Sequence, residues 1–107
     1  MKRGRRKEPT AAEKRHFDRV AAMGCLVCGA PATIHHVTGY ADRPGRFSRD
    51  HWLVTPLCPL HHQAVYDSAS MPVSVERLSH QGFFLEHGID LLAVAMELAE
   101  ETQRKAA

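Results

Sequence analysis

The sequence predicts a small α+β domain built around a zinc ion. Two close pairs of metal-binding residues, Cys25-x2-Cys28 and Cys58-x2-His61, are separated by 29 residues. A β-branched run over residues 32–38 predicts one strand, and a second strand is expected to end at Cys58. Amphipathic segments predict helices on both flanks. Strands between two ligand pairs, with helices outside them, indicate one metal-stapled domain.

The two ligand pairs favour zinc over other metals. Each pair closes a short knuckle, and four thiolate or imidazole donors fill a tetrahedral zinc shell. Magnesium and calcium prefer oxygen ligands in larger shells. Buried apolar cysteines, or a Cys25–Cys28 redox pair, are the alternatives, and neither accounts for the matching Cys-x2-His. We therefore expect Cys25, Cys28, Cys58 and His61 to hold a structural zinc ion.

The neighbouring histidines need a separate explanation, because a tetrahedral ion has no room for them. His35 and His36 are adjacent on the predicted strand, so their side chains point to opposite faces. Pro59 suits the first turn of a short helix after Cys58. Neighbours on a helix differ by about 100° in direction. His61 can therefore face the zinc while His62 turns toward the strand.

This order of strand, long loop, strand and helix between two knuckles resembles the HNH endonucleases, which have a ββα-metal core on a treble-clef zinc knuckle. The phrases that carry the resemblance are Ala-Met-Gly-Cys-Leu-Val-Cys, Ile-His-His-Val, His-Trp-Leu-Val-Thr-Pro-Leu-Cys-Pro-Leu-His-His and His-Gly-Ile-Asp-Leu-Leu. They are most similar to small phage nucleases of the RecA-dependent Ref type, over roughly residues 17 to 92. The resemblance implies a treble-clef zinc domain with an HNH core and flanking helices.

The resemblance also implies roles for three histidines. His35 would hold a catalytic divalent ion (Mg²⁺, Mn²⁺ or Zn²⁺), His62 would be its second ligand, and His36 would be the general base. Phosphodiester hydrolysis needs a nucleophilic water and stabilised negative charge. A neutral imidazole with a pKa of about 6.5 is suited to taking the proton from water. An ion with two or three protein ligands leaves positions open for phosphate oxygens.

Two positions depart from the family pattern. The family's middle asparagine would fall near Leu53, which has no polar group, and His51 is expected to take the orienting role instead. Many members place a third metal ligand one helical turn after the closing histidine, where this chain has Tyr66. Asp67, His80 or solvent are the alternatives for completing the shell.

Length and composition agree with a single small domain. A chain of 107 residues, 44% of them hydrophobic, forms a modest core that a metal staple would strengthen. No apolar run approaches about 20 residues, so we expect neither a membrane span nor a signal peptide. Three cysteines argue against a disulfide framework. Together with the resemblance, these features predict a cytoplasmic protein of a bacterial or phage-infected cell.

Basic residues are concentrated at the N-terminus. The remainder of the chain carries nine basic against 12 acidic residues, because five of the 14 Lys and Arg residues are Lys2, Arg3, Arg5, Arg6 and Lys7. We expect residues 1–9 to form a disordered basic tail that binds DNA phosphates, and residues 10–107 to form the single zinc domain. A solubilising terminus is the alternative for the tail.

The loop between the predicted strands adds three further arginines, Arg43, Arg46 and Arg49. Loops of this length are often functional, and we expect this one to follow the nucleic-acid backbone. Ordinary solvated arginines are the alternative.

The flanking helices are predicted over residues 11–23, 73–87 and from Asp90 to about 104. Thr10-Ala-Ala-Glu13 has capping-box spacing, and Gly88 is a natural stop for the second helix. The short helix after Cys58 is expected to reach about residue 67. His80 and His87 are expected on the surface.

The function that the sequence predicts is hydrolysis of DNA phosphodiester bonds by a metal-dependent HNH endonuclease, in phage recombination or DNA processing. DNA is the expected partner, and the resemblance adds a RecA filament. The alternative is a catalytically inactive, zinc-stabilised nucleic-acid-binding module, which Leu53 and Tyr66 favour. A third interpretation is a protein-partner adaptor that uses the acidic C-terminal helix.

Overall fold

The computed structural model describes residues 8–37 and 51–106. Its elements, in chain order, are α1 (Ala11–Ala21), β1 (Thr33–His36), β2 (Val54–Leu57), α2 (Pro59–His62), a 3₁₀ turn η1 (Ala64–Tyr66), α3 (Val75–His87) and α4 (Leu91–Ala106). This is the predicted α+β class. The predicted DNA-contacting basic residues of the tail and of the inter-strand loop lie outside the described ranges.

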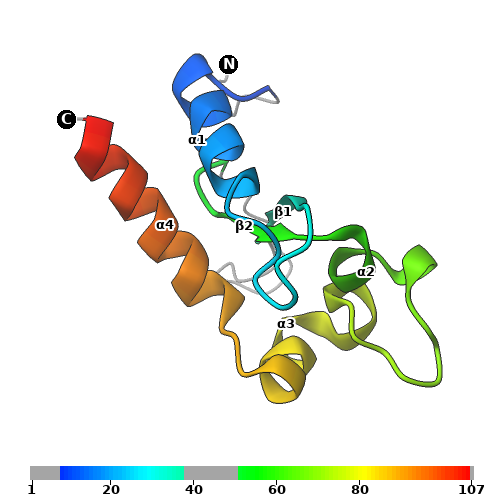
Figure 1. The fold of residues 1–107 in the computed structure, drawn as a ribbon. Helices are drawn as coiled ribbons and strands as arrows, with labels where there is room; N and C mark the ends of the chain where they lie inside the picture. The colour runs from blue at the N-terminus through cyan, green and yellow to red at the C-terminus, as the bar shows by residue number, and fades with distance from the viewer. Residues whose placement is uncertain (1–7, 38–50, 107) are drawn as a thin grey trace, which may run out of the picture.

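The centre of the fold is an antiparallel pair of strands. In its register Ile34 lies opposite Pro56, His35 opposite Thr55 and His36 opposite Val54. All four residues of β2 are buried. Helices α1 and α4 pack against β2 and lie to its upper left in Figure 1, whereas α2 and α3 lie to the lower right. The strand pair therefore separates two helical groups.

Helix α1 begins at the predicted capping box. The Thr10 hydroxyl accepts the N–H of Glu13 at 3.2 Å, and the Glu13 carboxylate accepts the N–H of Thr10 at 2.7 Å. The helix ends two residues before the predicted end, at Ala21, and the chain turns at Gly24 with a φ of 83°. A Cβ at Gly24 would lie 3.0 Å from the carbonyl oxygen of Gly29. The entry into the first ligand pair therefore requires glycine at this position.

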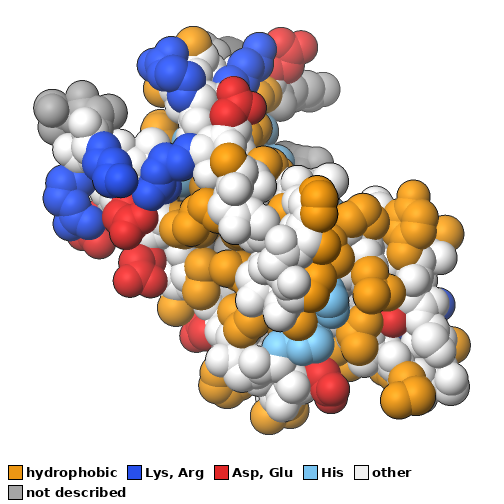
Figure 2. Space-filling view, viewed as in Figure 1, with side chains coloured by type: hydrophobic (Ala, Val, Ile, Leu, Met, Phe, Trp, Pro, Cys, Tyr) orange, Lys and Arg blue, Asp and Glu red, His pale blue; other side chains and the backbone are white. Residues whose placement is uncertain are grey.

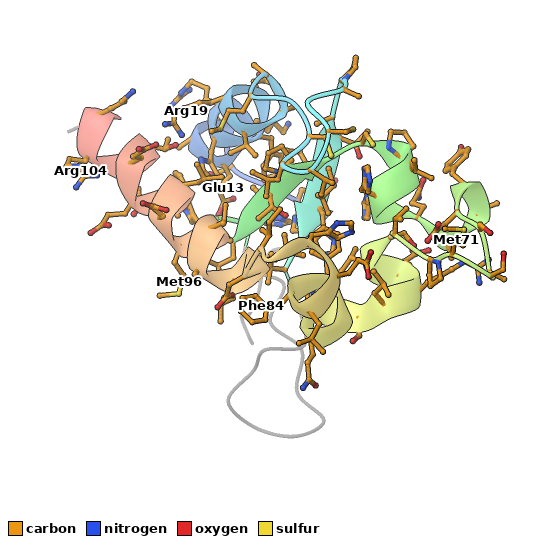
Figure 3. The ribbon with its side chains drawn as sticks, turned by 60° about the horizontal axis from the view of Figure 1, so that its bottom comes forward. Glu13, Arg19, Met71, Phe84, Met96 and Arg104 are labelled. Carbon is orange, nitrogen blue, oxygen red and sulfur yellow. The ribbon has the colours of Figure 1, made fainter. Side chains whose placement is uncertain are left out.

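A polar network ties α1 to α4 (Figure 3 labels Arg19 where the two helices face each other). Arg19 donates to the Thr102 hydroxyl at 2.8 Å and to Glu101 at 2.6 Å. His16 is fully buried, with Nδ1 2.8 Å from Thr102 Oγ1 and Nε2 3.1 Å from the carbonyl oxygen of Trp52. Because a carbonyl only accepts, Nε2 carries the proton and Nδ1 accepts from Thr102. The network therefore holds a neutral His16 against the backbone of Trp52, which follows His51 in the chain.

Helix α2 is shorter than predicted. It ends at His62, because Gln63 is extended, with φ −114° and ψ 135°. The carboxylate of Asp67 instead accepts the backbone N–H groups of Val73 at 2.9 Å and Ser74 at 2.8 Å. These bonds close the loop that leads into α3.

Helices α3 and α4 follow the predicted caps closely. Helix α3 starts two residues later than predicted, after Ser74, whose side chain accepts the N–H of Arg77 at 3.3 Å. It ends at Gly88, which has a φ of 73°. The carboxylate of Asp90 accepts the N–H of Ala93 at 3.1 Å and so caps α4. Within the described ranges no helix has the length and apolarity needed to cross a membrane.

The main hydrophobic core includes two of the expected metal ligands. Cys25 and Cys58 are each 5% exposed and pack in one cluster with Leu57, Phe83 and Leu91. A bound ion at these thiols would therefore link the knuckles to the interior of the domain.

Candidate metal centre and histidine clusters

Two tight turns present the four predicted zinc ligands. In the first knuckle, Cys25 donates its N–H to the carbonyl of Ala30 at 2.9 Å and accepts the N–H of Gly29 at 2.9 Å. In the second, the Cys58 carbonyl accepts the N–H groups of His61 at 3.1 Å and His62 at 2.9 Å. Cys58 is the N-cap of α2, so its thiol and the His61 ring lie on the same turn.

The ligand atoms are arranged as a tetrahedral metal shell requires. The ligand atoms of Cys25, Cys28, Cys58 and His61 all lie within 4.8 Å of one another. The Sγ atoms of Cys28 and Cys58 are 3.7 Å apart, and His61 Nδ1 is 3.6 Å from Cys25 Sγ and 3.3 Å from Cys58 Sγ. Zinc bonds of about 2.3 Å to sulfur and 2.0–2.1 Å to nitrogen give tetrahedron edges of about 3.5–3.8 Å. The four residues are thus placed to hold a metal ion, consistent with zinc.

The ionisation of these groups also suits a divalent ion. Burial opposes ionisation of Cys25, but hydrogen bonds from the backbone of Cys58, Cys28 and Val27 lower its pKa. Burial, with the neighbouring thiols, raises the pKa of Cys58. The protein alone therefore favours the thiolate at Cys25 and the thiol at Cys58, and a bound divalent cation would favour the thiolate at both. Burial lowers the pKa of His61, which keeps its ring neutral and able to bind metal.

The two histidines of β1 point to opposite faces, as predicted. His35 faces α2 and α3, where its ring centroid lies 4.9 Å from that of His62 and 5.3 Å from that of His80. The Nε2 atoms of His35 and His80 are 3.1 Å apart. Figure 2 shows histidine side chains at the molecular surface in the lower half of the view. One face of β1 thus carries a cluster of three imidazoles.

The imidazoles of this cluster are neutral at physiological pH. Burial, with the neighbouring His62, His80 and His36, lowers the pKa of His35 to about 3. Burial also lowers the pKa of His62 and of His80. Neutral rings keep a lone pair that can bind a metal ion. Among the described residues, the cysteine site is the group that brings three or more potential ligand atoms within 4.8 Å of one another. As a group, the potential ligand atoms of the histidine cluster lie farther apart.

His36 lies on the other face of β1, toward α1. Its Nε2 atom is 3.0 Å from Nδ1 of His51, and the ring of Phe17 lies edge-on to both imidazoles. His51 is 8% exposed, and its Nε2 atom is buried without a hydrogen-bond partner. The structure therefore pairs the two residues for which a catalytic role was expected.

His80 and His87 are less exposed than the sequence indicated. His80 was expected on the surface but is partly buried against His35. His87 is also partly buried, and its Nε2 donates to the Val73 carbonyl at 2.9 Å while its ring packs on Phe83. Helix α3 has non-helical backbone angles at Ser79, immediately before His80, and no local sequence pattern indicated this break.

The structure also describes the positions at which the sequence departs from the HNH proteins that it resembles. Leu53 packs against the hydrophobic core. Tyr66 is 60% exposed. Partial burial opposes ionisation of Asp67, but hydrogen bonds from Ser74 and Val73 lower its pKa to about 2. These bonds hold the Asp67 carboxylate in the loop.

Comparison with known proteins gives one family. The family described as recombination enhancement, RecA-dependent nuclease matches residues 9–80, about two thirds of the chain. The matched range contains the four cysteine-site ligands and both histidine clusters. No curated protein and no solved structure gives a significant match.

Proposed function

Because the chain belongs to the family of RecA-dependent nucleases of recombination enhancement, we propose that it is a metal-dependent endonuclease of the HNH type. Its substrate is DNA, and its partner is a RecA filament. The cysteine site is the structural zinc site, and the histidines of β1 carry the chemistry. The observation that supports this best is the sorting of the imidazoles onto two faces of one short strand.

The cluster on the α2 side would hold the catalytic ion through His35 and His62. Both rings are partly buried and have a lowered pKa, which suits neutral metal ligands. When bound, the divalent ion supplies positive charge that stabilises the phosphate and the leaving oxygen. Because His62 directly follows the proposed zinc ligand His61 in the chain, the location of its ring depends on the cysteine site.

The pair on the α1 side would move the proton. His36 takes a proton from the attacking water, and His51 orients the ring through the 3.0 Å contact. Within the residues that the structure describes, the sheet has two strands, so no strand lies beside the outer edge of β1. Successive side chains of a strand point to opposite faces, so His35 and His36 would approach a phosphate at this edge from opposite faces. DNA would also contact the basic tail and the loop arginines.

The second candidate function is a zinc-stabilised nucleic-acid-binding module without catalysis. The observations that favour it are the apolar Leu53 in place of an orienting amide and the exposed Tyr66 in place of a ligand. Such a module would keep the zinc site and the basic segments but would not cut DNA.

A nicking assay separates the two functions. Supercoiled plasmid and single-stranded DNA are incubated with Mg²⁺, Mn²⁺, Zn²⁺ or Ni²⁺, with and without a RecA filament, using wild type, His36→Ala and the surface control Gln81→Ala. We expect His36→Ala to keep its zinc, fold and DNA affinity but to cut about 10²-fold more slowly, the usual effect of losing a general base. Equal cutting by His36→Ala would remove His36 from the mechanism. No cutting by wild type under any condition would favour the binding module.

A further inference from the structure

Helix α3 is broken at Ser79, immediately before His80. Ser79 has φ 68° and ψ 171° and is the one residue other than glycine with a positive φ in the described ranges. This conformation is essentially restricted to glycine, because a side chain is strained there. Strained backbone of this kind persists only where the surrounding structure holds it, and it clusters at functional sites.

The break makes α3 two short helices rather than one. The Ser79 hydroxyl accepts the N–H of Gly82 at 3.4 Å, which is the contact of an N-cap for the second half. A Cβ at Gly82 would lie 3.2 Å from Cβ of Leu78, so the two halves are closely packed at the junction. His80 becomes the first residue of the second half instead of an interior residue of a continuous helix.

The restart brings His80 against His35. Their Nε2 atoms are 3.1 Å apart, and the ring planes are inclined by 35°. Metal bonds to nitrogen of about 2.0–2.1 Å place two adjacent ligands of one ion about 2.9–3.4 Å apart, depending on geometry. The observed separation falls within this range. The same separation also fits a hydrogen bond between two neutral imidazoles. A measurement of metal binding is needed to distinguish a shared ion from a hydrogen bond.

Other residues near the cluster are less suited to complete the shell. Tyr66, four residues after His62, is exposed. Asp67 accepts hydrogen bonds from the backbone of Val73 and Ser74. Because α2 ends at His62, it offers no further ligand one turn later. A third ligand therefore has to come from another element, and α3 is the nearest candidate.

We propose that His80 is the third protein ligand of the catalytic ion, and that Ser79 is a strained positioning residue that aims it at His35. This inference rests on the proposed function, because it assumes that an ion binds at His35 and His62. It adds an element to the site that lies outside the strand–helix unit carrying the other ligands.

Binding of Co²⁺ to the zinc-loaded protein tests the inference without measuring cleavage. Zinc remains at the cysteine site, which the absence of thiolate-to-cobalt charge-transfer absorption verifies, so the d–d bands report the histidine cluster. We expect His80→Ala to weaken Co²⁺ binding by at least 10-fold, as the loss of a ligand should, while zinc content and the thermal transition stay as in Gln81→Ala.

Two substitutions at Ser79 test the positioning role with His80 still present. Glycine adopts the φ of 68° without strain, so Ser79→Gly should retain Co²⁺ affinity. A β-branched residue is a severe outlier at positive φ, so Ser79→Val should straighten the helix and weaken Co²⁺ as His80→Ala does. Equal affinity in Ser79→Val and Ser79→Gly would overturn the positioning role; if Ser79→Val does not fold, weakened Co²⁺ in Ser79→Gly would overturn it instead.

The outcomes separate this inference from the proposed function. If His80→Ala binds Co²⁺ as tightly as wild type, His80 is not a ligand and the 3.1 Å contact is a hydrogen bond, whereas the nuclease proposal stands. If wild type binds no Co²⁺ beyond the zinc site, the inference is wrong whatever the nicking assay shows. If His80→Ala loses Co²⁺ but wild type cuts no DNA, the ligand assignment holds and the nuclease proposal fails.

Discussion

Replacing Cys28 with alanine should release the zinc and unfold the domain, although the side chain itself contributes little packing. Cys28 is exposed, unlike Cys25 and Cys58. Removal of an exposed group usually changes the free energy of unfolding by no more than about 0.5 kcal/mol. Structural zinc contributes on the order of 10–16 kcal/mol in small zinc-binding peptides, against a net stability of about 5–15 kcal/mol for a typical domain. Zinc loss should therefore remove most of the stability.

The measurement combines metal analysis with guanidinium unfolding followed by circular dichroism. Wild type should carry one tightly bound zinc ion per chain, and Cys28→Ala should have lost it and show no cooperative transition. Leu60→Ala is the control, because Leu60 lies between the ligands Cys58 and His61 on α2, is 42% exposed and has no metal-binding group. In chelator-treated samples the three proteins should behave alike. A zinc-free wild type with a sharp transition, or Cys28→Ala with the wild-type midpoint, would refute the zinc staple.

Two further predictions concern the tail and the buried histidine of α1. Deleting residues 1–8 should weaken DNA binding equally for all sequences and flatten the dependence of log affinity on log salt, because fewer counterions are released; an unchanged slope would show that the tail does not contact DNA. Burial lowers the pKa of His16, so below a pH of about 6.5 the unfolded state binds the proton more readily and stability falls. His16→Gln should be less stable than wild type at pH 7.5 but should lose less free energy of unfolding between pH 7.5 and 5.5. An unchanged loss would show that His16 does not cause this pH dependence.

Local patterns in the sequence were sufficient to predict the four clustered metal-binding side chains and the opposed histidines of β1. Cys25-x2-Cys28 and Cys58-x2-His61 are short-range features, each set by a single turn of backbone. The direction of His35 and His36 follows from the alternation of side chains along any strand. Neither prediction depended on how distant segments pack.

The position of His80 could not be predicted in the same way, because it depends on a single backbone angle. A serine inside an amphipathic segment usually continues the helix, and nothing local requires a positive φ at Ser79. The close packing of Gly82 on Leu78 and the contact with His35 are made only in the folded chain. The early end of α2 is a similar case, since Asp67 finds its partners in the loop that leads to α3.

The shortness of α2 has a consequence for how the protein would respond to its cellular environment. A helix of four residues does not persist alone in water, because nucleation costs more than one turn returns. His62 follows His61 on this turn, so an ion bound by His61 would also fix the position of His62. In a cell short of zinc the proposed nuclease would be synthesised but idle, and supplying magnesium or manganese would not restore it. Its cutting would thus follow zinc supply, even though zinc itself need not touch the DNA.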